Sequence, residues 1–196
     1  MRESKKATIM EEIMKLKQIF VAALFALIAS GGLFAQGSAK SKTLVVYFSW
    51  SGTTEKVAQM IAKSTGADLF RIEPTQAYPI SYKDCADIVK KELDGGKIRT
   101  VKSAPDFSKY DTIFVGVPVW WHTAPTLMTH FLEENKEALK GKTIIPFCTY
   151  QATYRAETLQ AIVDATPTAN HKEGYGTTNP NQNDVDAWLK KIGLGK

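Results

Sequence analysis

The chain has 196 residues, of which 44% are hydrophobic and 23% charged, and this composition excludes a disordered or fibrous protein. Six of its 25 Lys or Arg residues and three of its 20 Asp or Glu residues lie in residues 1–40, so residues 41–196 carry a net charge of about +2 rather than +5. This near balance, without a basic cluster interleaved with aromatics, argues against a nucleic-acid-binding protein.

An uncharged apolar run occupies residues 19–35 and follows Lys15 and Lys17, which is the pattern of a secretory signal peptide. We therefore expect residues 1–40 to be signal peptide and linker, with cleavage after Ala35 or Ala39. The protein would then be exported, to the periplasm or outside the cell. The alternative is a retained membrane anchor, for which 17 uncharged residues are at the short end.

A second possible start of translation, Met14, precedes the basic residues, so residues 1–13 are a possible upstream extension. The mature chain is expected to be a single domain of residues 41–196.

Short β-rich runs alternate with amphipathic runs after residue 42. The predicted strands are 43–48, 68–73, 111–117, 143–149 and, more weakly, 169–175. The predicted helices are 53–64, 80–95, 125–138, 155–164 and 183–193. Continuous apolar strands that alternate with helices indicate a parallel sheet covered on both faces, a doubly wound α/β domain. Such sheets bind ligands beyond the carboxyl ends of their strands.

The segment 49–54, SWSGTT, connects the first strand to the first helix. Free backbone amides and the positive end of the helix dipole favour an anion at this position. Hydroxyl side chains add neutral donors, and Gly52 lets the backbone approach a phosphate closely. A phosphate can therefore be bound here without a cation. The alternative is simple helix capping, with Ser51 or Thr53 as the cap.

Other motifs fail on spacing. The dinucleotide-binding glycine pattern, the P-loop and the nucleophile elbow each lack a required glycine. The three histidines have no spacing typical of a metal site, and we expect them to be surface or satisfied core residues. Cys85 and Cys148 could pair in an exported protein, but two separate buried thiols are the simpler interpretation.

Three stretches together resemble the flavodoxin family: the phosphate loop with Ser49, Ser51, Gly52 and Thr54, the segment 116–133 (GVPVWWHTAPTLMTHFLE), and the final VDAWLKKIG. The resemblance covers about residues 43–193 and includes small exported bacterial members. It implies a flavodoxin-like five-stranded parallel sheet in the order 2-1-3-4-5, with bound FMN.

Aromatic residues suit the flat apolar ring of a flavin. Trp120 and Trp121 follow the third strand, where at least one should face the flavin. The indole N–H of Trp50 could reach the ribityl or phosphate region, and the alternative for Trp50 is packing in the core. Members of the family commonly place glycines after the fourth strand, whereas this chain reads TYQATY over 149–154. Either side chains including Gln151 replace some of the backbone contacts, or the affinity for flavin is lower. The expected FMN-binding residues are Ser49, Trp50, Ser51, Gly52, Thr53, Thr54, Pro118, Trp120, Trp121, Thr149, Tyr150 and Tyr154, and no catalytic residue or metal ligand is expected.

Three functions follow from this resemblance. The first is an electron carrier that uses bound FMN, with an unidentified redox protein or small-molecule acceptor as partner. The second is an FMN-dependent NAD(P)H reductase of quinone-like acceptors, and the third is a module of the same fold without flavin. Carriers of the family tend to be strongly acidic, so the near-neutral mature segment does not predict their usual partners.

Overall fold

The structure, a computed structural model, describes residues 42–195. Its strands are β1 (Thr43–Tyr47), β2 (Asp68–Arg71), β3 (Thr112–Pro118), β4 (Thr143–Thr149), β5 (Asn170–His171) and β6 (Tyr175–Thr177). Its helices are α2 (Thr53–Thr65), α3 (Tyr82–Leu93), α4 (Thr126–Glu134), α5 (Lys136–Leu139), α6 (Arg155–Asp164) and α7 (Gln182–Lys191), and a short 3-10 helix, η1 (Phe107–Lys109), precedes β3. The predicted signal peptide, cleavage sites and upstream extension fall outside the described residues.

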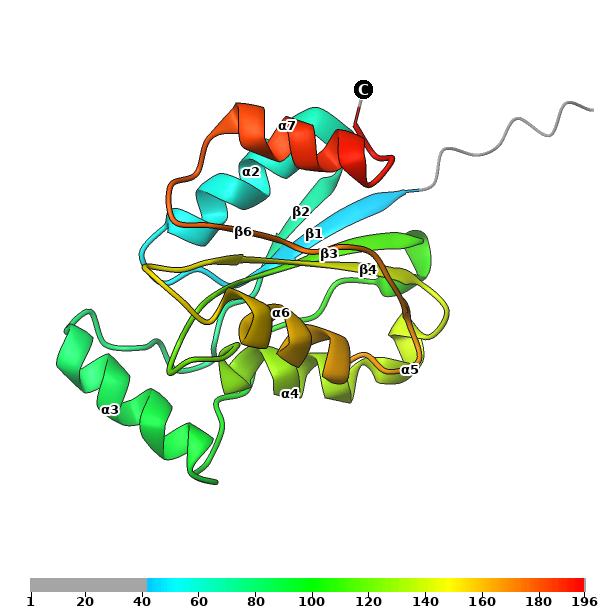
Figure 1. The fold of residues 1–196 in the computed structure, drawn as a ribbon. Helices are drawn as coiled ribbons and strands as arrows, with labels where there is room; N and C mark the ends of the chain where they lie inside the picture. Colours follow the sequence, from blue (N-terminus) through cyan, green and yellow to red (C-terminus); the bar gives the residue numbers. More distant parts are fainter. Residues whose placement is uncertain (1–41, 196) are drawn as a thin grey trace, which may run out of the picture. The chain divides into compact units, whose positions relative to one another are not determined.

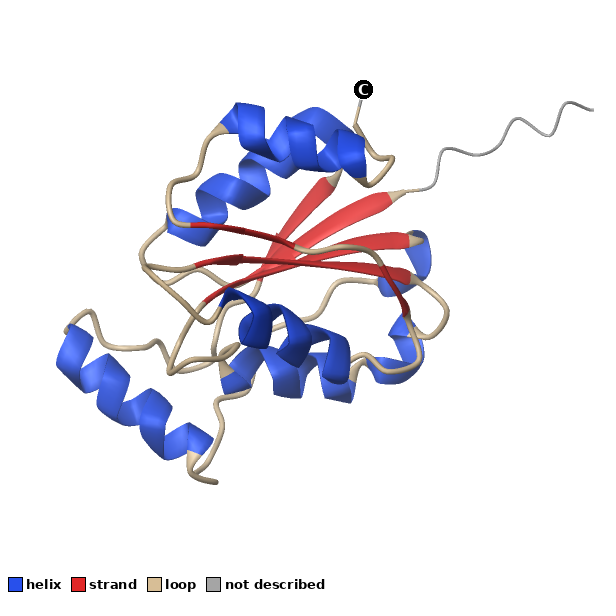
Figure 2. Cartoon of the chain, in the orientation of Figure 1, coloured by secondary structure: helices blue, strands red, loops and turns tan. Residues whose placement is uncertain are grey.

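The strands form a parallel sheet in the order β2-β1-β3-β4-β5 (Figures 1 and 2). The predicted fold and strand order are therefore confirmed. The weakly predicted strand 169–175 is in fact two short strands, β5 beside the start of β4 and β6 beside its end.

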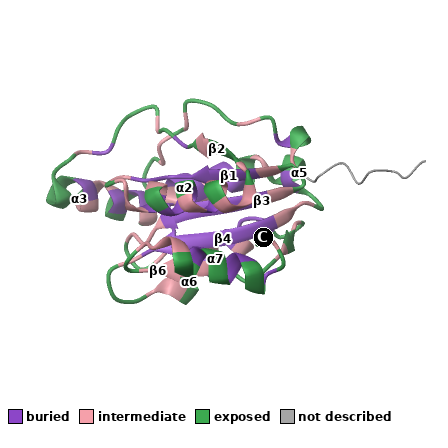
Figure 3. Ribbon diagram, turned by 90° about the horizontal axis from the view of Figure 1, so that it is seen from above, coloured by how far each residue is buried: buried purple, intermediate pink, exposed green. Residues whose placement is uncertain are grey.

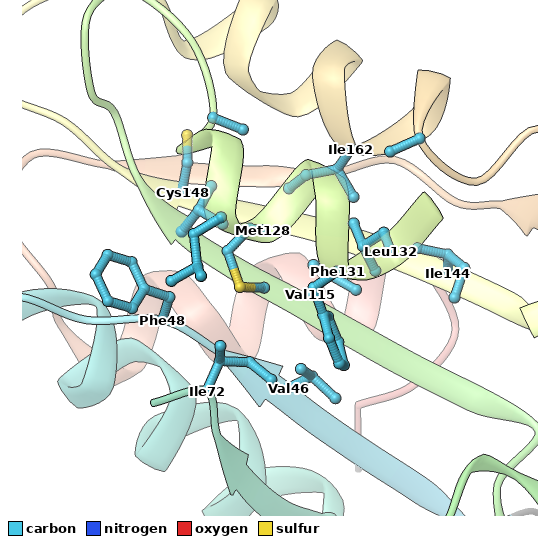
Figure 4. Packing of buried hydrophobic residues seen from close by; sticks show 14 of the residues in the cluster. Val46, Phe48, Ile72, Val115, Met128, Phe131, Leu132, Ile144, Cys148 and Ile162 are labelled. Atoms are coloured by element: carbon cyan, nitrogen blue, oxygen red, sulfur yellow. The ribbon is translucent and has the colours of Figure 1, made fainter. Parts of the chain in front are cut away.

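Alternation along β1 explains the two layers of helices. Val45 and Tyr47 belong to the buried cluster that includes residues of α2 and α7. Leu44 and Val46 point to the opposite face and join the cluster under α4 and α6. Successive side chains of a strand point to opposite faces, so a continuously apolar strand supplies both cores. Figure 3 shows the buried residues gathered on the strands, and Figure 4 shows Val46, Val115 and Met128 packed in the second cluster.

The last helix follows its predicted pattern. The apolar residues of α7 and its C-cap, Val185, Trp188, Leu189 and Ile192, are all buried. Among residues 42–195, no helix has the length and apolar character that a membrane crossing requires.

The carboxyl ends of the strands meet at one edge of the sheet. Tyr47 near the end of β1 is paired with Gly116 of β3, Pro118 is paired with Thr149, and Thr149 with Thr177. The loops that follow β1, β3, β4 and β6 therefore lie next to one another, as the sequence predicts for the ligand-binding edge.

Candidate functional site

The loop between β1 and α2 is folded around a buried serine. Ser49 is 3% exposed, and its Oγ accepts a hydrogen bond from the backbone N–H of Gly52 at 3.1 Å. Its carbonyl oxygen accepts another from Arg71 Nη2 at 3.0 Å. Gly52 is the N-cap of α2 and has a φ of 86°, a left-handed conformation that glycine adopts without strain. Ser49 and Gly52 thus set the shape of the turn.

The N-terminus of α2 has no side-chain cap, so the alternative interpretation, in which Ser51 or Thr53 serves as the cap, is wrong. The two hydroxyl oxygens instead lie 3.3 Å from each other. The first helical hydrogen bond runs from Lys56 N to Gly52 O, so the amides before Lys56 have no intrahelical acceptor. This leaves a helix N-terminus whose amides and dipole favour an anion.

A buried hydroxyl pair joins this loop to the end of β4. The oxygens Thr54 Oγ1 and Thr149 Oγ1 are 2.8 Å apart, and the residues are 1% and 6% exposed. A pair of this kind satisfies both hydroxyls where water is excluded. Thr54 and Thr149 therefore fix the distance between the first and third loops of the site.

Three tryptophans line the same cavity, and we call them the tryptophan wall: Trp50, Trp120 and Trp121. Trp120 packs edge-to-face against Trp50, with ring centroids 6.3 Å apart. The Trp121 indole N–H donates to Ala86 O at 2.9 Å. The Trp50 indole N–H donates to Pro79 O at 3.0 Å. The sequence had suggested that this N–H could reach a ribityl or phosphate group, but in the structure it is bound to the protein.

The third loop brings a stacked pair into the site. The rings of His122 and Tyr154 are 3.9 Å apart at an interplanar angle of 30°. These two residues and Trp121 are the non-glycine residues with positive φ in the described chain, with φ values of 71°, 66° and 46°. Such strained backbone often marks a functional site. Tyr154 adopts here a conformation that a glycine would adopt freely, and it is the N-cap of α6.

These loops enclose a cavity of about 630 Å³. Nine of the twelve predicted site residues line it, and Ser49, Gly52 and Thr54 do not. The nine are Trp50, Ser51, Thr53, Pro118, Trp120, Trp121, Thr149, Tyr150 and Tyr154. Ser49 and Thr54 are buried, and their hydrogen bonds hold the loops.

Sequence reasoning missed the part of the cavity lining that comes from α3. Tyr82, Cys85, Ala86 and Val89 all face the cavity from this helix. Their i, i+3, i+4, i+7 spacing marks one face of a helix, but the pattern does not say against what that face packs. His122, expected at the surface or in the core, also lines the cavity, as do Val119, Gln151, Ala152, Thr153 and Thr178.

The cavity lining consists of aromatic, apolar and hydroxyl or amide side chains, with one cysteine and one histidine. Its lining residues include no Asp, Glu, Lys or Arg. Burial raises the pKa of the Cys85 thiol, and it raises that of Cys148 to about 12. Both thiols are free and buried, which confirms the prediction of two separate thiols. They remain protonated and unreactive near neutral pH.

The comparisons with known proteins agree with this geometry. The model of the flavodoxin family matches residues 42–192. A protein of Bacteroides eggerthii DSM 20697, provisionally classed as a flavoprotein, is 30% identical with a TM-score of 0.67 over 78% of this chain and 98% of its own. One of Bacteroides uniformis ATCC 8492 is 28% identical with a TM-score of 0.68 over 76% of this chain and 98% of its own.

A third structure, of a Lactobacillus acidophilus NCFM flavoprotein in complex with FMN, has the same fold at 22% identity, with a TM-score of 0.66 over 78% of this chain and 98% of its own. No curated protein matches the sequence. The family model covers most of the chain, and the strand order 2-1-3-4-5 is that of the flavodoxin-like fold, so this chain belongs to the flavodoxin family.

Proposed function

We propose that this protein binds FMN in the cavity and transfers electrons through it. The observation that carries the proposal is the combination of an uncapped helix N-terminus with an aromatic cavity, lined by no Asp, Glu, Lys or Arg, at the carboxyl edge of the sheet. A phosphate suits the first feature and a flavin ring suits the second. The Lactobacillus flavoprotein with bound FMN, which has the same fold, supports this choice of ligand.

The residues of the phosphate loop fit the proposed ligand. The backbone amides that begin α2 and the hydroxyls of Ser51 and Thr53 are hydrogen-bond donors that suit an anion. A Cβ at Gly52 would have no atom within 4 Å, so the space beside its backbone is open. We infer that the phosphate is held by these donors without a cation.

The tryptophan wall and the loop after β4 would hold the ring. Bound FMN supplies one- and two-electron redox chemistry. Aromatic side chains solvate an added negative charge poorly, and the cavity wall offers no Lys or Arg to compensate for it. We infer that the protein lowers the reduction potential of its flavin relative to free FMN.

A second candidate function is reduction of a quinone-like acceptor with NAD(P)H. The observation in its favour is the apolar wall that α3 adds, with Ala86 and Val89, together with the 44% exposure of Trp121. A planar apolar acceptor would fit against such surfaces. An electron carrier needs no such second surface for a small molecule.

A titration of the purified protein with FMN tests the proposal and separates the two candidates. We expect flavin fluorescence to be quenched and the visible spectrum to shift as the ring enters an aromatic site. Anaerobic addition of NADH or NADPH should leave the flavin oxidised if the protein is a carrier. Rapid bleaching would establish the reductase instead, and absence of any FMN binding would favour a module without flavin.

Tyr154→Ala should lower FMN affinity roughly tenfold, because the flavin loses about 1 kcal/mol of stacking on the Tyr154 ring together with some apolar burial. One face of the Tyr154 ring already lies on His122, so at most the other face is open to a ligand. Fluorescence titration of the variant measures the change. Tyr82→Ala is the control, because this residue lines the same cavity but is 79% exposed. Equal effects of the two changes would contradict a specific role for Tyr154.

A further inference from the structure

All three residues of the tryptophan wall are held by a single segment, residues 72–111, which connects β2 to β3 and which we call the α3 connection. The Trp50 indole donates to Pro79 O, and the Trp121 indole donates to Ala86 O. Trp120 packs edge-to-face on Tyr78, with ring centroids 4.9 Å apart. The wall itself comes from the loops after β1 and β3, so its orientation depends on a distant part of the chain.

The α3 connection adds no strand to the sheet, although Tyr78, Cys85 and Val89 are buried in the same cluster as Leu44 and Val46 of β1. Figure 1 shows α3 standing apart from the helices that cover the two faces of the sheet. An isolated bridge between Pro74 and Val101 closes the base of the connection. Between this base and the tryptophans, the connection needs an internal anchor if it is to hold aromatic rings in fixed positions.

That anchor is a buried charged cluster around Glu92, whose side chain is 3% exposed. One carboxylate oxygen is paired with the Arg99 guanidinium. The other accepts the phenol hydrogen bond of Tyr78 at 2.8 Å and faces the hydroxyl of Thr126, on α4, at 3.4 Å. Arg99 also donates from Nε to Gln76 O at 3.0 Å.

Tyr78 is fixed by this cluster in two ways. Its hydroxyl is bonded to Glu92, and its ring face lies under the Arg99 guanidinium, 4.3 Å from the ring centroid. Burial, followed by the bond to Glu92, raises the pKa of the Tyr78 phenol well above its ordinary value. The phenol therefore stays a donor throughout the usable pH range.

We propose that Glu92 and Arg99 are positioning residues of the flavin site: they fix Tyr78, and Tyr78 fixes the ring of Trp120. A buried ion pair is by itself weak evidence for stability, because desolvation offsets its attraction. Its best-supported advantage is a defined arrangement of the groups around it. Here those groups include Tyr78, which packs on Trp120 in the cavity wall. The proposal rests on the proposed function only in taking FMN as the ligand.

The test uses two variants, Glu92→Gln and Tyr78→Phe. The first leaves Arg99 without its charged partner, which endangers folding, so the second is needed because it keeps both the ring and the ion pair. Two quantities are measured: the near-ultraviolet circular dichroism of the protein without flavin, and the dissociation constant of FMN. We expect both variants to change the tryptophan bands and to weaken FMN about fivefold, the size of coupling usual between residues in contact.

Two controls identify the route. Lys102→Met removes an exposed ion pair with Glu73 in the same connection and should change neither quantity. In a Trp120→Phe background, Tyr78→Phe should no longer weaken FMN, since its effect passes through the missing indole.

The proposal is overturned if Glu92→Gln and Tyr78→Phe lower the melting temperature but leave the tryptophan bands and FMN affinity unchanged. The circular dichroism measurement needs no bound flavin, so it tests the positioning proposal separately from the proposed function. If wild-type protein fails to bind FMN, the proposed function is lost, while altered tryptophan bands in Tyr78→Phe would still support positioning and unaltered bands would overturn it.

Discussion

Replacing Trp120 with Ala is expected to weaken FMN binding by about a hundredfold, because the cavity would lose roughly 1 kcal/mol of stacking and about 2 kcal/mol of apolar burial. Trp120 is the residue of the tryptophan wall that contacts the most other aromatic rings. Its ring packs edge-to-face on Phe48 at 5.2 Å and on Tyr78 at 4.9 Å, and it lines the cavity. Fluorescence titration of the variant measures the loss directly.

A pair of conservative changes separates ligand binding from stability. Trp188 also packs edge-to-face on a phenylalanine, Phe114, at 5.7 Å, but in the cluster on the opposite face of the sheet. Trp188→Phe and Trp120→Phe should both lower the melting temperature, since each leaves a small void. Only Trp120→Phe should weaken FMN. If both variants bind FMN as the wild type does, the tryptophan wall has no part in ligand binding.

The fold could be predicted because its signals are local and repeated. The runs 43–48 and 143–149 are apolar on both faces, which only a sheet covered on both sides explains, and α7 carries its buried residues at helical spacing. The last strand was predicted weakly because β5 and β6 are short and offer little apolar pattern: both strand residues of β5, Asn170 and His171, are polar.

The site could be predicted only where chain order determines neighbours. The loops after β1, β3 and β4 must meet at the carboxyl edge of a parallel sheet, so nine of the predicted residues share one cavity. The wall from α3 could not be predicted, because its docking depends on contacts such as Trp121 to Ala86. The positive φ of Trp121, His122 and Tyr154 could not be predicted either, because glycine is the usual sequence sign of a positive φ and none stands at these positions.

The sequence difference after β4 now has a structural meaning. Where glycines are common in the family, Tyr154 holds a left-handed backbone at φ 66° and stacks on His122 from the opposite loop. A left-handed conformation costs a bulky residue on the order of 1 kcal/mol, which a 3.9 Å aromatic stack can offset. The loop therefore keeps a glycine-like backbone while it adds a side chain to the cavity wall.

The protein should bind FMN about a hundredfold more tightly than riboflavin, which lacks only the phosphate. Two charge-assisted hydrogen bonds at about 1.5 kcal/mol each account for this preference, and the N-terminus of α2 offers more than two amides. Parallel titrations with the two flavins measure it. Equal affinities would remove the loop 49–54 from the binding site.

Two glycines of the same helix make a matched test of this loop. Gly52 and Gly66 are the N-cap and C-cap of α2, with φ values of 86° and 74°, and a Cβ at either position would have no atom within 4 Å. Ala at either position therefore introduces left-handed strain of about 1 kcal/mol without a clash.

Gly52→Ala and Gly66→Ala should lower the melting temperature by similar amounts, about 2–4 °C for a domain of this size. Their effects on ligand binding should differ. The methyl group at Gly52 would occupy the open space beside the amides that bind phosphate, so FMN affinity should fall about tenfold while riboflavin affinity changes little. Gly66→Ala lies at the other end of the helix and should leave both affinities unchanged. A loss for FMN that matched the loss for riboflavin in Gly52→Ala would mean that the loop supports the ring and not the phosphate.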